Sequence, residues 1–562
     1  MKTTPFLFFL TALILVNITG LYTGVFLSDS SLYAQISKSF VTSHNWWDIY
    51  VNGHDWLDKP HFPFWLCAIS MQLFGINSFA YKLPSILLFL ASLFYTYKLA
   101  EKLYNKKTAR IAVLMLASSV HIIISNNDTR AEAILIGLIM GSVYHLFSLS
   151  QRYATKDLLL GSLFCAMAIM TKGIFVLIIV FSAVFGHLLF KKEYAKLLQI
   201  KWLLVFVLTA IFILPELYVL YTQFDLHPEK IVFGKTHVSG IKFFLWDSQF
   251  GRFVNTGPIK GNGDPFFFFH TLLWAFAPWA IVGYMALFNA LNKLAKRKRL
   301  TEYVSICGFL IMFIVFSTSQ FQLPHYTNIL FPFLSIMCAK YIMDNKDKKW
   351  LVKTFRVSQI IYIGVYFIML SLIIIFFRAD NWILTGLIII ASCISLVFVL
   401  RKFNTVILQF FSASLVCTMM FLLYLNLVFY PKLLTYQSAG NAAEYVNAHY
   451  PHNTIVNTFE EPLMEFTAKN NVGYINDNDL SRLKKTDQNK KIIYYVDQHF
   501  LDTLQTTGIQ YHKIETFYGY HITKLKKDFF YYKTREHTLE PTFLIEIKNN
   551  NPISIEGEKN LH

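Results

Sequence analysis

Long apolar runs alternate with short polar connections along residues 1–430 of the chain. A bilayer core about 30 Å thick is crossed by about 20 apolar residues in a helix, and this pattern predicts about thirteen membrane-spanning helices. The first run is longer than the apolar part of a signal peptide, and no small-residue cleavage site precedes Asp29, so we interpret it as a helix. The predicted ranges are 5–27, 80–100, 108–125, 131–150, 157–171, 173–190, 202–222, 266–291, 302–317, 326–343, 357–377, 381–400 and 406–430.

The composition agrees with a polytopic membrane protein. Apolar residues make up 55% of the 562 positions, charged residues make up 15%, and Phe alone occurs 54 times. A soluble protein carries about 25% charged residues, and the mean hydropathy of this chain is +0.43. These values exclude a disordered chain, a coiled coil and an ordinary cytosolic enzyme.

The net charge of +17 indicates topology rather than nucleic-acid binding. With the N-terminus in the cytoplasm, the cytoplasmic connections hold about 24 Lys and Arg, following the positive-inside rule. The short turns on the other side hold about three, Arg130, Lys172 and Arg378. The chain is therefore predicted to keep two longer outer loops, 28–79 and 223–265, and residues 431–562 on the outer side of a bacterial-type inner membrane.

The C-terminal residues 431–562 are polar, and short β-branched or aromatic runs alternate there with helical stretches. We predict strands at 454–459, 472–475, 491–496, 511–517 and 542–547, with helices near 462–469 and 499–506. This order is typical of a small α/β domain, which would lie in the periplasm. The six cysteines all fall in apolar segments outside this tail, so no disulfide framework is predicted.

The first outer loop begins with Asp29, directly after the first predicted helix. A carboxylate at the end of a membrane helix lies at the water interface, where it can face a lipid headgroup. Asp29 is therefore a candidate catalytic carboxylate. The alternative is a helix N-cap, a role for which Ser28, Asp29 and Ser30 are equally suited.

Farther along this loop, Asp58-Lys59-Pro60 stands among aromatic residues in GHDWLDKPHFPFW. Such a cluster could hold a divalent cation through Asp58 and a phosphate through Lys59. An interfacial helix that starts near a proline, with a snorkelling lysine, is an alternative that is compatible with both roles.

Two further candidates lie where the positive-inside rule is broken. Arg130 is two residues from Glu132 at the start of a predicted helix, so an Arg–carboxylate pair at the membrane surface is one interpretation, and two charges that mark a helix end are the other. Lys172, in the run MTKG, is also predicted to face outward, which suggests a specific anionic partner such as a phosphate.

Histidines in the later outer segments are weaker candidates. His270 and His325 could be ligands, but a single histidine is more often a hydrogen-bonded interface residue. The sequence contains no phosphate-binding Walker loop, HExxH or dinucleotide fingerprint in a suitable context, so soluble nucleotide chemistry is not supported.

Over about residues 1–340 these segments follow one another as they do in integral-membrane glycosyltransferases. The chain resembles the GT-C superfamily, specifically the group that contains the lipid A aminoarabinose transferases and the protein O-mannosyltransferases. Each motif is weak alone, but their order and topology together are specific. The motifs are Asp29 with Tyr33-Ala34, Gly53 with Asp58-Lys59-Pro60 and Trp65, Phe74-Gly75 with Phe79 and Lys82, Arg130 with Glu132, Met170 to Gly173, Pro265-Phe266 with Pro278-Trp279, and Leu323-Pro324 with Tyr326.

The resemblance implies a polyprenyl-phosphate sugar donor taken from the membrane, with Asp29 near the anomeric carbon. Glu132 is our second candidate for a catalytic carboxylate. An inverting displacement aims the acceptor oxygen opposite the phosphate leaving group and deprotonates that oxygen if it is an alcohol. Lys59, Arg130 and Lys172 are the candidates for binding the donor phosphate. If the acceptor is itself a phosphate, no base is needed and Asp29 would only orient or stabilise.

The chain also departs from the aminoarabinose transferases. They have Glu where Asp58 stands and His where Asn262 stands, so the suggested metal site lacks its second ligand unless His270 substitutes. Their basic residues before LPxY are replaced here by Gln320 and Gln322. The resemblance therefore carries the reaction class and leaves the sugar open.

The sequence thus predicts a multi-pass inner-membrane glycosyltransferase of the GT-C type, with about 13 helices in residues 1–430 and an extracytoplasmic α/β domain in residues 431–562. It would move one sugar from a polyprenyl phosphate to a lipid or protein acceptor on the periplasmic face, with inversion. A lipid or oligosaccharide flippase is the main alternative, and it predicts paired broken helices with ionisable residues near the midplane. A membrane-anchored binding protein that works through its tail is another.

Overall fold

The computed structural model describes residues 2–27, 29–256, 260–475 and 492–547. The chain divides into two compact units. The first comprises Met1–Gly24, Ser39–Ile49 and Asp55–Pro431, and the second comprises Val25–Lys38, Tyr50–His54 and Lys432–His562. The unit boundary therefore passes through the first outer loop as well as through the start of the C-terminal tail.

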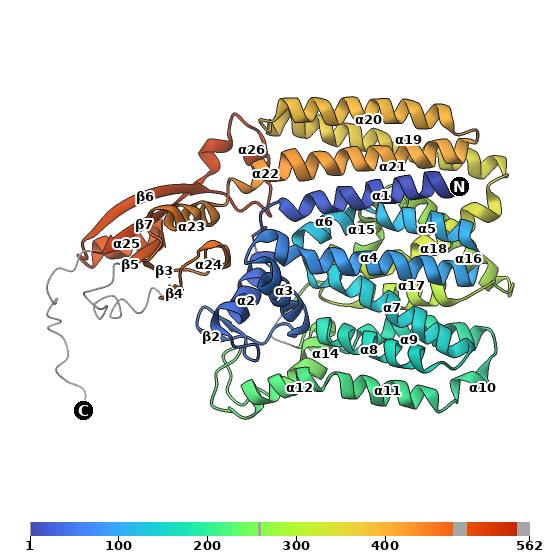
Figure 1. The fold of residues 1–562 in the computed structure, drawn as a ribbon, viewed down its shortest axis with the longest axis horizontal. Coiled ribbons are helices and arrows are strands. Elements are labelled where there is room, and N and C mark those ends of the chain that lie inside the picture. Colours follow the sequence, from blue (N-terminus) through green and yellow to red (C-terminus); the bar gives the residue numbers. More distant parts are fainter. Residues whose placement is uncertain (1, 28, 257–259, 476–491, 548–562) are drawn as a thin grey trace. The chain divides into compact units, whose positions relative to one another are not determined.

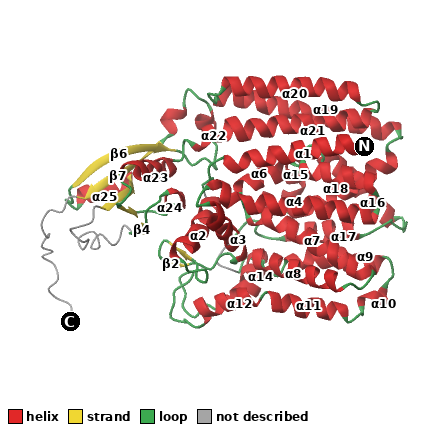
Figure 2. Ribbon diagram, in the orientation of Figure 1, coloured by secondary structure: helices red, strands yellow, loops and turns green. Residues whose placement is uncertain are grey.

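The first unit is helical (Figures 1 and 2). Its longer helices run side by side in Figure 1, and shorter ones connect them. The helices are α1 (Thr3–Thr19), α3 (Phe62–Phe74), α4 (Ser78–Leu103), α5 (Lys106–Ala117), α6 (Val120–Asp128), α7 (Ala131–Gln151), α8 (Thr155–Lys172), α9 (Val176–Phe190), α10 (Tyr194–Leu197), α11 (Lys201–Phe212), α12 (Leu214–Leu220), α13 (Gly240–Lys242), α14 (Ser248–Phe253), α15 (Phe267–Ala275), α16 (Ala280–Ala295), α17 (Val304–Thr318), α18 (Phe331–Asn345), α19 (Lys349–Leu372), α20 (Trp382–Lys402), α21 (Val406–Tyr424) and, at the unit boundary, α22 (Tyr430–Leu434).

Each predicted membrane range coincides with a helix or with consecutive helices. Within the described residues, eight helical segments are long and apolar enough to cross a membrane, or nine if α5 and α6 form one span bent by 53°. Four more apolar helices are shorter, among them α9, α16 and α17. The polytopic helical architecture is therefore confirmed, while the number thirteen stays a prediction.

At the break between α5 and α6, polar groups that a continuous helix would pair internally find other hydrogen-bond partners. Ser118 and Ser119 donate their hydroxyl hydrogens to carbonyls of the preceding turn, at Leu114 and Met115. The Val120 amide donates to the Ala277 carbonyl at 3.2 Å, in the segment between α15 and α16. Two broken helices thus supply each other's missing partners, which an apolar environment requires.

The centre of the first unit is α7. Within its most apolar stretch, 94% of the residues are buried, and the helix packs against α4 and α8. Gly137 permits the approach to α4, because a Cβ at this position would lie 2.2 Å from the Leu88 carbonyl oxygen. Small residues allow helices to approach closely in this way, and the packing fixes the first turn of α7, which carries Glu132.

The second unit contains a five-stranded sheet with the order β4-β3-β5-β7-β6. β3 is parallel to β4 and β5, whereas β7 is antiparallel to β5 and β6. Val496, Phe500 and Phe543 are members of its apolar core. The strands are β3 (Thr454–Asn457), β4 (Val472–Tyr474), β5 (Ile492–Asp497), β6 (Tyr511–Gly519) and β7 (Glu540–Ile547), and the helices are α23 (Ser438–His449), α24 (Pro462–Thr467), α25 (Gln498–Thr506) and α26 (Lys527–Phe530).

All five predicted strands and both predicted helices of the tail are found at the expected places. Helix α23 was not predicted, although Ala439, Ala442, Ala443 and Val446 recur along one buried face at helical spacing. The second unit also includes the first ten residues of α2 (Asp29–Ser43) and β1 (Tyr50–Val51), and β2 (His54–Asp55) begins in it. No sequence pattern predicted this association.

Candidate functional site

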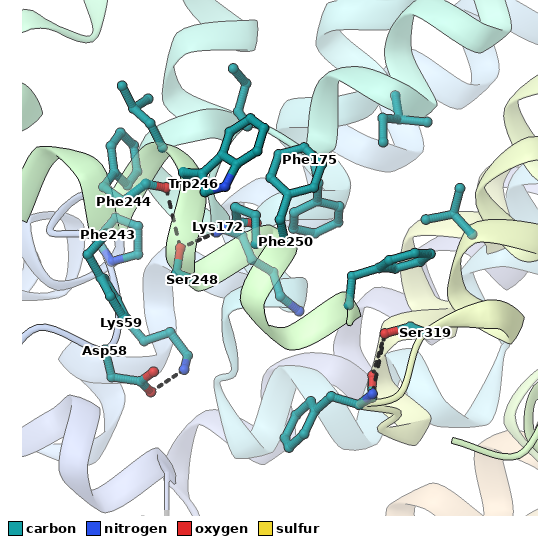
Figure 3. Close-up of a pocket in the computed structure, with 18 of the residues that line it drawn as sticks. Asp58, Lys59, Lys172, Phe175, Phe243, Phe244, Trp246, Ser248, Phe250 and Ser319 are labelled. Atoms are coloured by element: carbon teal, nitrogen blue, oxygen red, sulfur yellow. Dashed lines mark hydrogen bonds and ion pairs between the residues drawn. The ribbon is translucent and has the colours of Figure 1, made fainter. Parts of the chain in front are cut away.

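A cavity of about 760 Å³ lies within the first unit. Its walls are mostly apolar, and Phe243, Phe244 and Trp246 from the segment before α14 contribute aromatic rings. Figure 3 shows Lys59 and Lys172 reaching into the same hollow from two different segments of the chain. The cavity therefore combines mostly apolar walls with two cationic side chains.

Asp58 and Lys59 lie in the connection between β2 and α3, and both line the cavity. Their side chains form an ion pair, and about a fifth of each remains exposed. Pro63 stands in the first turn of α3, where its missing amide hydrogen costs no helical hydrogen bond. The predicted helix after Pro60 is thus confirmed, and its start places both charged residues at the cavity wall.

Lys172 is the last residue of α8, and the next residue ends the helix. Gly173 has a φ of 98°, a conformation that residues with a Cβ rarely adopt. The Lys172 side chain forms an ion pair with Glu132, and its ammonium nitrogen lies 3.8 Å from the centroid of the Tyr326 ring. The motifs MTKG, RxE and LPxY therefore meet at one point.

Glu132 is the most buried member of this cluster, with 2% of its side chain exposed. It occupies the first turn of α7, where the helix dipole favours a carboxylate. His325 also lies near this carboxylate, with Nε2 3.7 Å from Glu132 Oε1. Glu132 therefore pairs with a lysine that lines the cavity, while Glu132 is not itself among the described lining residues.

The predicted pairing of Arg130 with Glu132 is wrong. Arg130 Nε donates to Asp128 Oδ2 at 2.5 Å, and Glu132 pairs with Lys172 instead. The cause is local geometry, because Arg130 is the extended N-cap residue of α7 while Glu132 lies inside the helix. Both charged residues do mark the start of α7, as the other interpretation held. Arg130 is not among the described residues that line the cavity.

Two buried residues at the site were missed by the sequence analysis. His61 directly follows Pro60, and its Nδ1 lies 3.0 Å from Glu216 Oε1. The Glu216 carboxylate also accepts the backbone N–H of His61, and Glu216 lines the cavity. A single carboxylate within the apolar run of α11 and α12 was the available signal, since ionisable residues in such runs are functional candidates.

The predicted metal ligands do not form a site that fits a divalent cation. Asp58 is paired with an ammonium group, which repels a cation. His270 is exposed on α15 and is not part of the described cavity lining. Among the described residues, no three His, Cys, Asp or Glu side chains come together in a group that could hold a metal ion. A requirement for a divalent cation is therefore not confirmed and stays a prediction.

Gln320 and Gln322, which replace the basic residues of the aminoarabinose transferases, make structural hydrogen bonds. Gln322 Oε1 accepts the backbone N–H of Asp264 at 2.9 Å, and Gln320 Oε1 accepts that of Gly263 at 3.4 Å. Both amides therefore tie the loop before α15 to the end of α17, and they carry no charge toward a ligand.

Asp29 belongs to the second unit, where it is half-buried and begins α2. A carboxylate in the first turn interacts favourably with the helix dipole, whatever its chemical role. The structure thus confirms a helix start at this position, and the catalytic role of Asp29 stays a prediction.

The chain is similar to known membrane glycosyltransferases. Residues 58–219 match the family described as dolichyl-phosphate-mannose-protein mannosyltransferase. An undecaprenyl phosphate-alpha-4-amino-4-deoxy-L-arabinose arabinosyl transferase of Proteus mirabilis is 26% identical over 357 residues, covering 62% of this chain and 61% of the relative. A similarly named transferase of Pseudomonas fluorescens is 27% identical over 337 residues, covering 58% and 55%. The similarity thus spans less than two thirds of the length of these relatives.

The fold extends farther than the sequence similarity. The crystal structure of ArnT from Cupriavidus metallidurans bound to undecaprenyl phosphate superposes with a TM-score of 0.72 at 14% identity, covering 97% of this chain and 98% of that one. The same protein in the apo state gives a TM-score of 0.70. The resemblance predicted from the motifs is therefore confirmed: the chain resembles the GT-C membrane glycosyltransferases, and within them the lipid A aminoarabinose transferases.

Proposed function

We propose that the protein is an inverting glycosyltransferase that moves a single sugar from a polyprenyl-phosphate donor to a lipid or protein acceptor on the periplasmic face of the inner membrane. The observation that carries this proposal is the placement of Lys59 and Lys172 in one otherwise largely apolar cavity. A polyprenyl phosphate has the matching chemistry, with an anionic head on a hydrocarbon chain. The names of the similar transferases support the same donor class.

In the proposed reaction, the acceptor oxygen attacks the anomeric carbon while the bond from that carbon to the phosphate oxygen breaks. The electron pair of that bond leaves with the polyprenyl phosphate. Lys59 and Lys172 stabilise the charge on the departing phosphate, because ammonium groups in a largely apolar site act more strongly than in water. Asp29 accepts the proton if the acceptor is an alcohol.

Glu132 has a supporting role in this scheme. Its carboxylate is paired with Lys172, so it fixes the direction of the Lys172 side chain. The donor headgroup therefore meets a cation whose position is set before binding. Arg130, paired with Asp128, remains a candidate only for the rim of the site.

Transfer itself is the test. The purified full-length protein would be incubated in nanodiscs with polyprenyl phosphate carrying a labelled hexose or pentose, together with an envelope extract as acceptor. We expect label in a lipid or protein product, and we expect Lys172→Met and Asp29→Asn to reduce the rate strongly, while Lys349→Met at the start of α19 does not. Transfer that is unchanged in Asp29→Asn would overturn the role of that carboxylate.

The same labelled donor, given to the purified protein in sealed proteoliposomes, separates the enzyme from a flippase. A flippase would move the labelled lipid across proteoliposomes without forming a new glycosidic bond. If translocation occurs and no covalent product appears with any acceptor fraction, the glycosyltransferase proposal fails.

A further inference from the structure

The segment that carries Asp29 is held by the C-terminal part of the chain. Residues 25–38 form one compact unit with residues 432–562, and two side chains make the connection. Gln437, in the C-terminal part, binds the backbone just before Asp29. Lys38 lies nine positions after Asp29 on helix α2 and binds backbone carbonyls of the C-terminal part. Both contacts join parts of the chain that are more than 400 residues apart.

Gln437 uses both ends of its amide on one short stretch of backbone. Its Oε1 accepts the N–H of Leu27 at 2.9 Å, and its Nε2 donates to the carbonyl of Val25 at 3.0 Å. Gln437 is 5% exposed and Val25 is 3% exposed, so water does not readily replace these bonds. The backbone two residues before Asp29 is thereby fixed in position and direction.

The main chain around Gln437 is itself anchored. The backbone N–H of Tyr520 donates to the Tyr436 carbonyl at 2.8 Å, and the buried Arg535 donates to the Tyr436 hydroxyl at 3.0 Å. The Tyr436 ring also packs edge-on against Phe529. Gln437 therefore extends from a rigid base next to the sheet, rather than from a mobile linker.

Lys38 makes the second connection. Its ammonium group donates to the backbone carbonyls of Glu465 and Ala468, at and just beyond the C-terminal end of α24. The end of a helix leaves such carbonyls without intrahelical partners, and its dipole attracts a cation. One charged side chain thus joins α2 to the end of α24.

We propose that Gln437 and Lys38 are positioning residues, through which the C-terminal domain sets the position of the Asp29 carboxylate. Helix α2 has 15 residues, a length at which an isolated helix is only marginally stable in water. Contacts on both sides of Asp29 therefore decide where this helix begins and how it is oriented. The inference rests on the proposed function only in taking Asp29 as the catalytic carboxylate.

The kinetic test replaces each amide or ammonium group by a side chain of similar shape. For Gln437→Leu and Lys38→Met in the full-length protein, we expect kcat to fall by about 10- to 100-fold, the range for a misplaced reacting group. The KM for the polyprenyl-phosphate sugar should stay within about twofold, since the cationic cavity is untouched. Lys38→Arg should recover most of the rate, and Gln409→Leu, a glutamine that bonds a backbone carbonyl in the first unit, should have no effect.

A second measurement does not depend on catalysis. Hydrogen exchange should become faster in residues 25–38 of Gln437→Leu, while strand β5 and helix α25 keep their protection, which also shows that the domain is folded. Unchanged kcat together with unchanged exchange in both variants would overturn the proposal. A different outcome is possible, in which Gln437→Leu exchanges faster and loses transfer but Asp29→Asn is fully active. That outcome would support the contacts and would overturn the catalytic role of Asp29.

Discussion

His61 and Glu216 form a buried pair in which the imidazole Nδ1 lies 3.0 Å from the carboxylate Oε1. The other ring nitrogen, Nε2, lies 3.0 Å from the backbone carbonyl of Trp47, which can only accept a hydrogen bond. Nε2 must therefore carry a hydrogen, and a further proton lies between Nδ1 and Glu216. His61 directly follows Pro60, so its pairing with Glu216 anchors the connection that carries Asp58 and Lys59.

Removing the carboxylate of Glu216 should destabilise the protein and displace this connection. Loss of one partner from a buried ionic pair costs about 3 to 5 kcal/mol, so we expect Glu216→Ala to lower the thermal unfolding temperature in detergent and to weaken binding of a polyprenyl phosphate. Glu216→Gln should retain most of both properties, because its amide can donate to Nδ1 and accept the His61 N–H. Equal behaviour of the two variants would contradict this role for the pair.

Lys172 and Glu132 should act as a unit in transfer. Removing one group that stabilises transition-state charge costs about 10²- to 10³-fold in rate, and we expect a loss of this size for Lys172→Met. Glu132→Gln should cost less, because the ammonium group remains but is no longer oriented. The measurement is a double-mutant cycle: the variant with both changes should be no slower than Lys172→Met alone, and additive losses would show that Glu132 acts independently.

Gly173 should resist substitution because of its backbone conformation. Its φ of 98° is one that an alanine adopts only with strain of about 1 to 3 kcal/mol, and a Cβ there would lie 2.3 Å from the Gln249 amide nitrogen. We expect Gly173→Ala to lower the unfolding temperature and the transfer rate, since the strain falls next to Lys172. Gly364, inside α19 with no atom within 4 Å of a Cβ, is the matched control, and Gly364→Ala should be neutral or slightly stabilising.

The sequence predicted those site residues that break a rule along the chain. Lys172 is a candidate because the topology predicts that it faces outward, against the positive-inside rule. Lys59 is a candidate because it stands next to Asp58 among aromatic residues. Glu216 is equally close to the cavity, but its partner His61 lies 155 positions away. Such pairings depend on which helices pack together, and residue spacing contains no information about them.

The architecture shows the same limit. Among the described residues, hydrophobic runs located the eight helical segments that are long and apolar enough to cross a membrane. Alternation located the strands of the tail, and both patterns are local. At the break between α5 and α6, the free Val120 amide is satisfied by the distant carbonyl of Ala277, a contact that no local pattern indicates. The association of residues 25–38 with the tail depends on single hydrogen bonds, such as that from Leu27 to Gln437, which leave no periodic signal.

The second unit should be least stable near neutral to mildly alkaline pH. Burial raises the pKa of Glu461 and of Glu465 to about 7, so between about pH 4.5 and 7 the folded unit holds protons that the unfolded chain releases, and stability falls as pH rises. Burial lowers the pKa of Lys38 to about 8, against the opposing attraction of Glu465. Above pH 8 the unfolded chain retains the proton that folded Lys38 has lost, so stability rises again.

Hydrogen exchange in β3 and β5, corrected for the intrinsic effect of pH, would measure this minimum, which we expect between about pH 7 and 8. Glu461→Gln should remove part of the fall on the acidic side, on the order of 1 to 2 kcal/mol between pH 5 and 7. Lys38→Met should remove the rise above pH 8 and leave the acidic side in place, apart from the small shift that Glu465 undergoes when its neighbouring cation is lost. A stability that does not change from pH 5 to 9 would contradict the raised pKa values of the two carboxyl groups. If Glu461→Gln leaves the fall in stability with pH unchanged, other groups cause that fall.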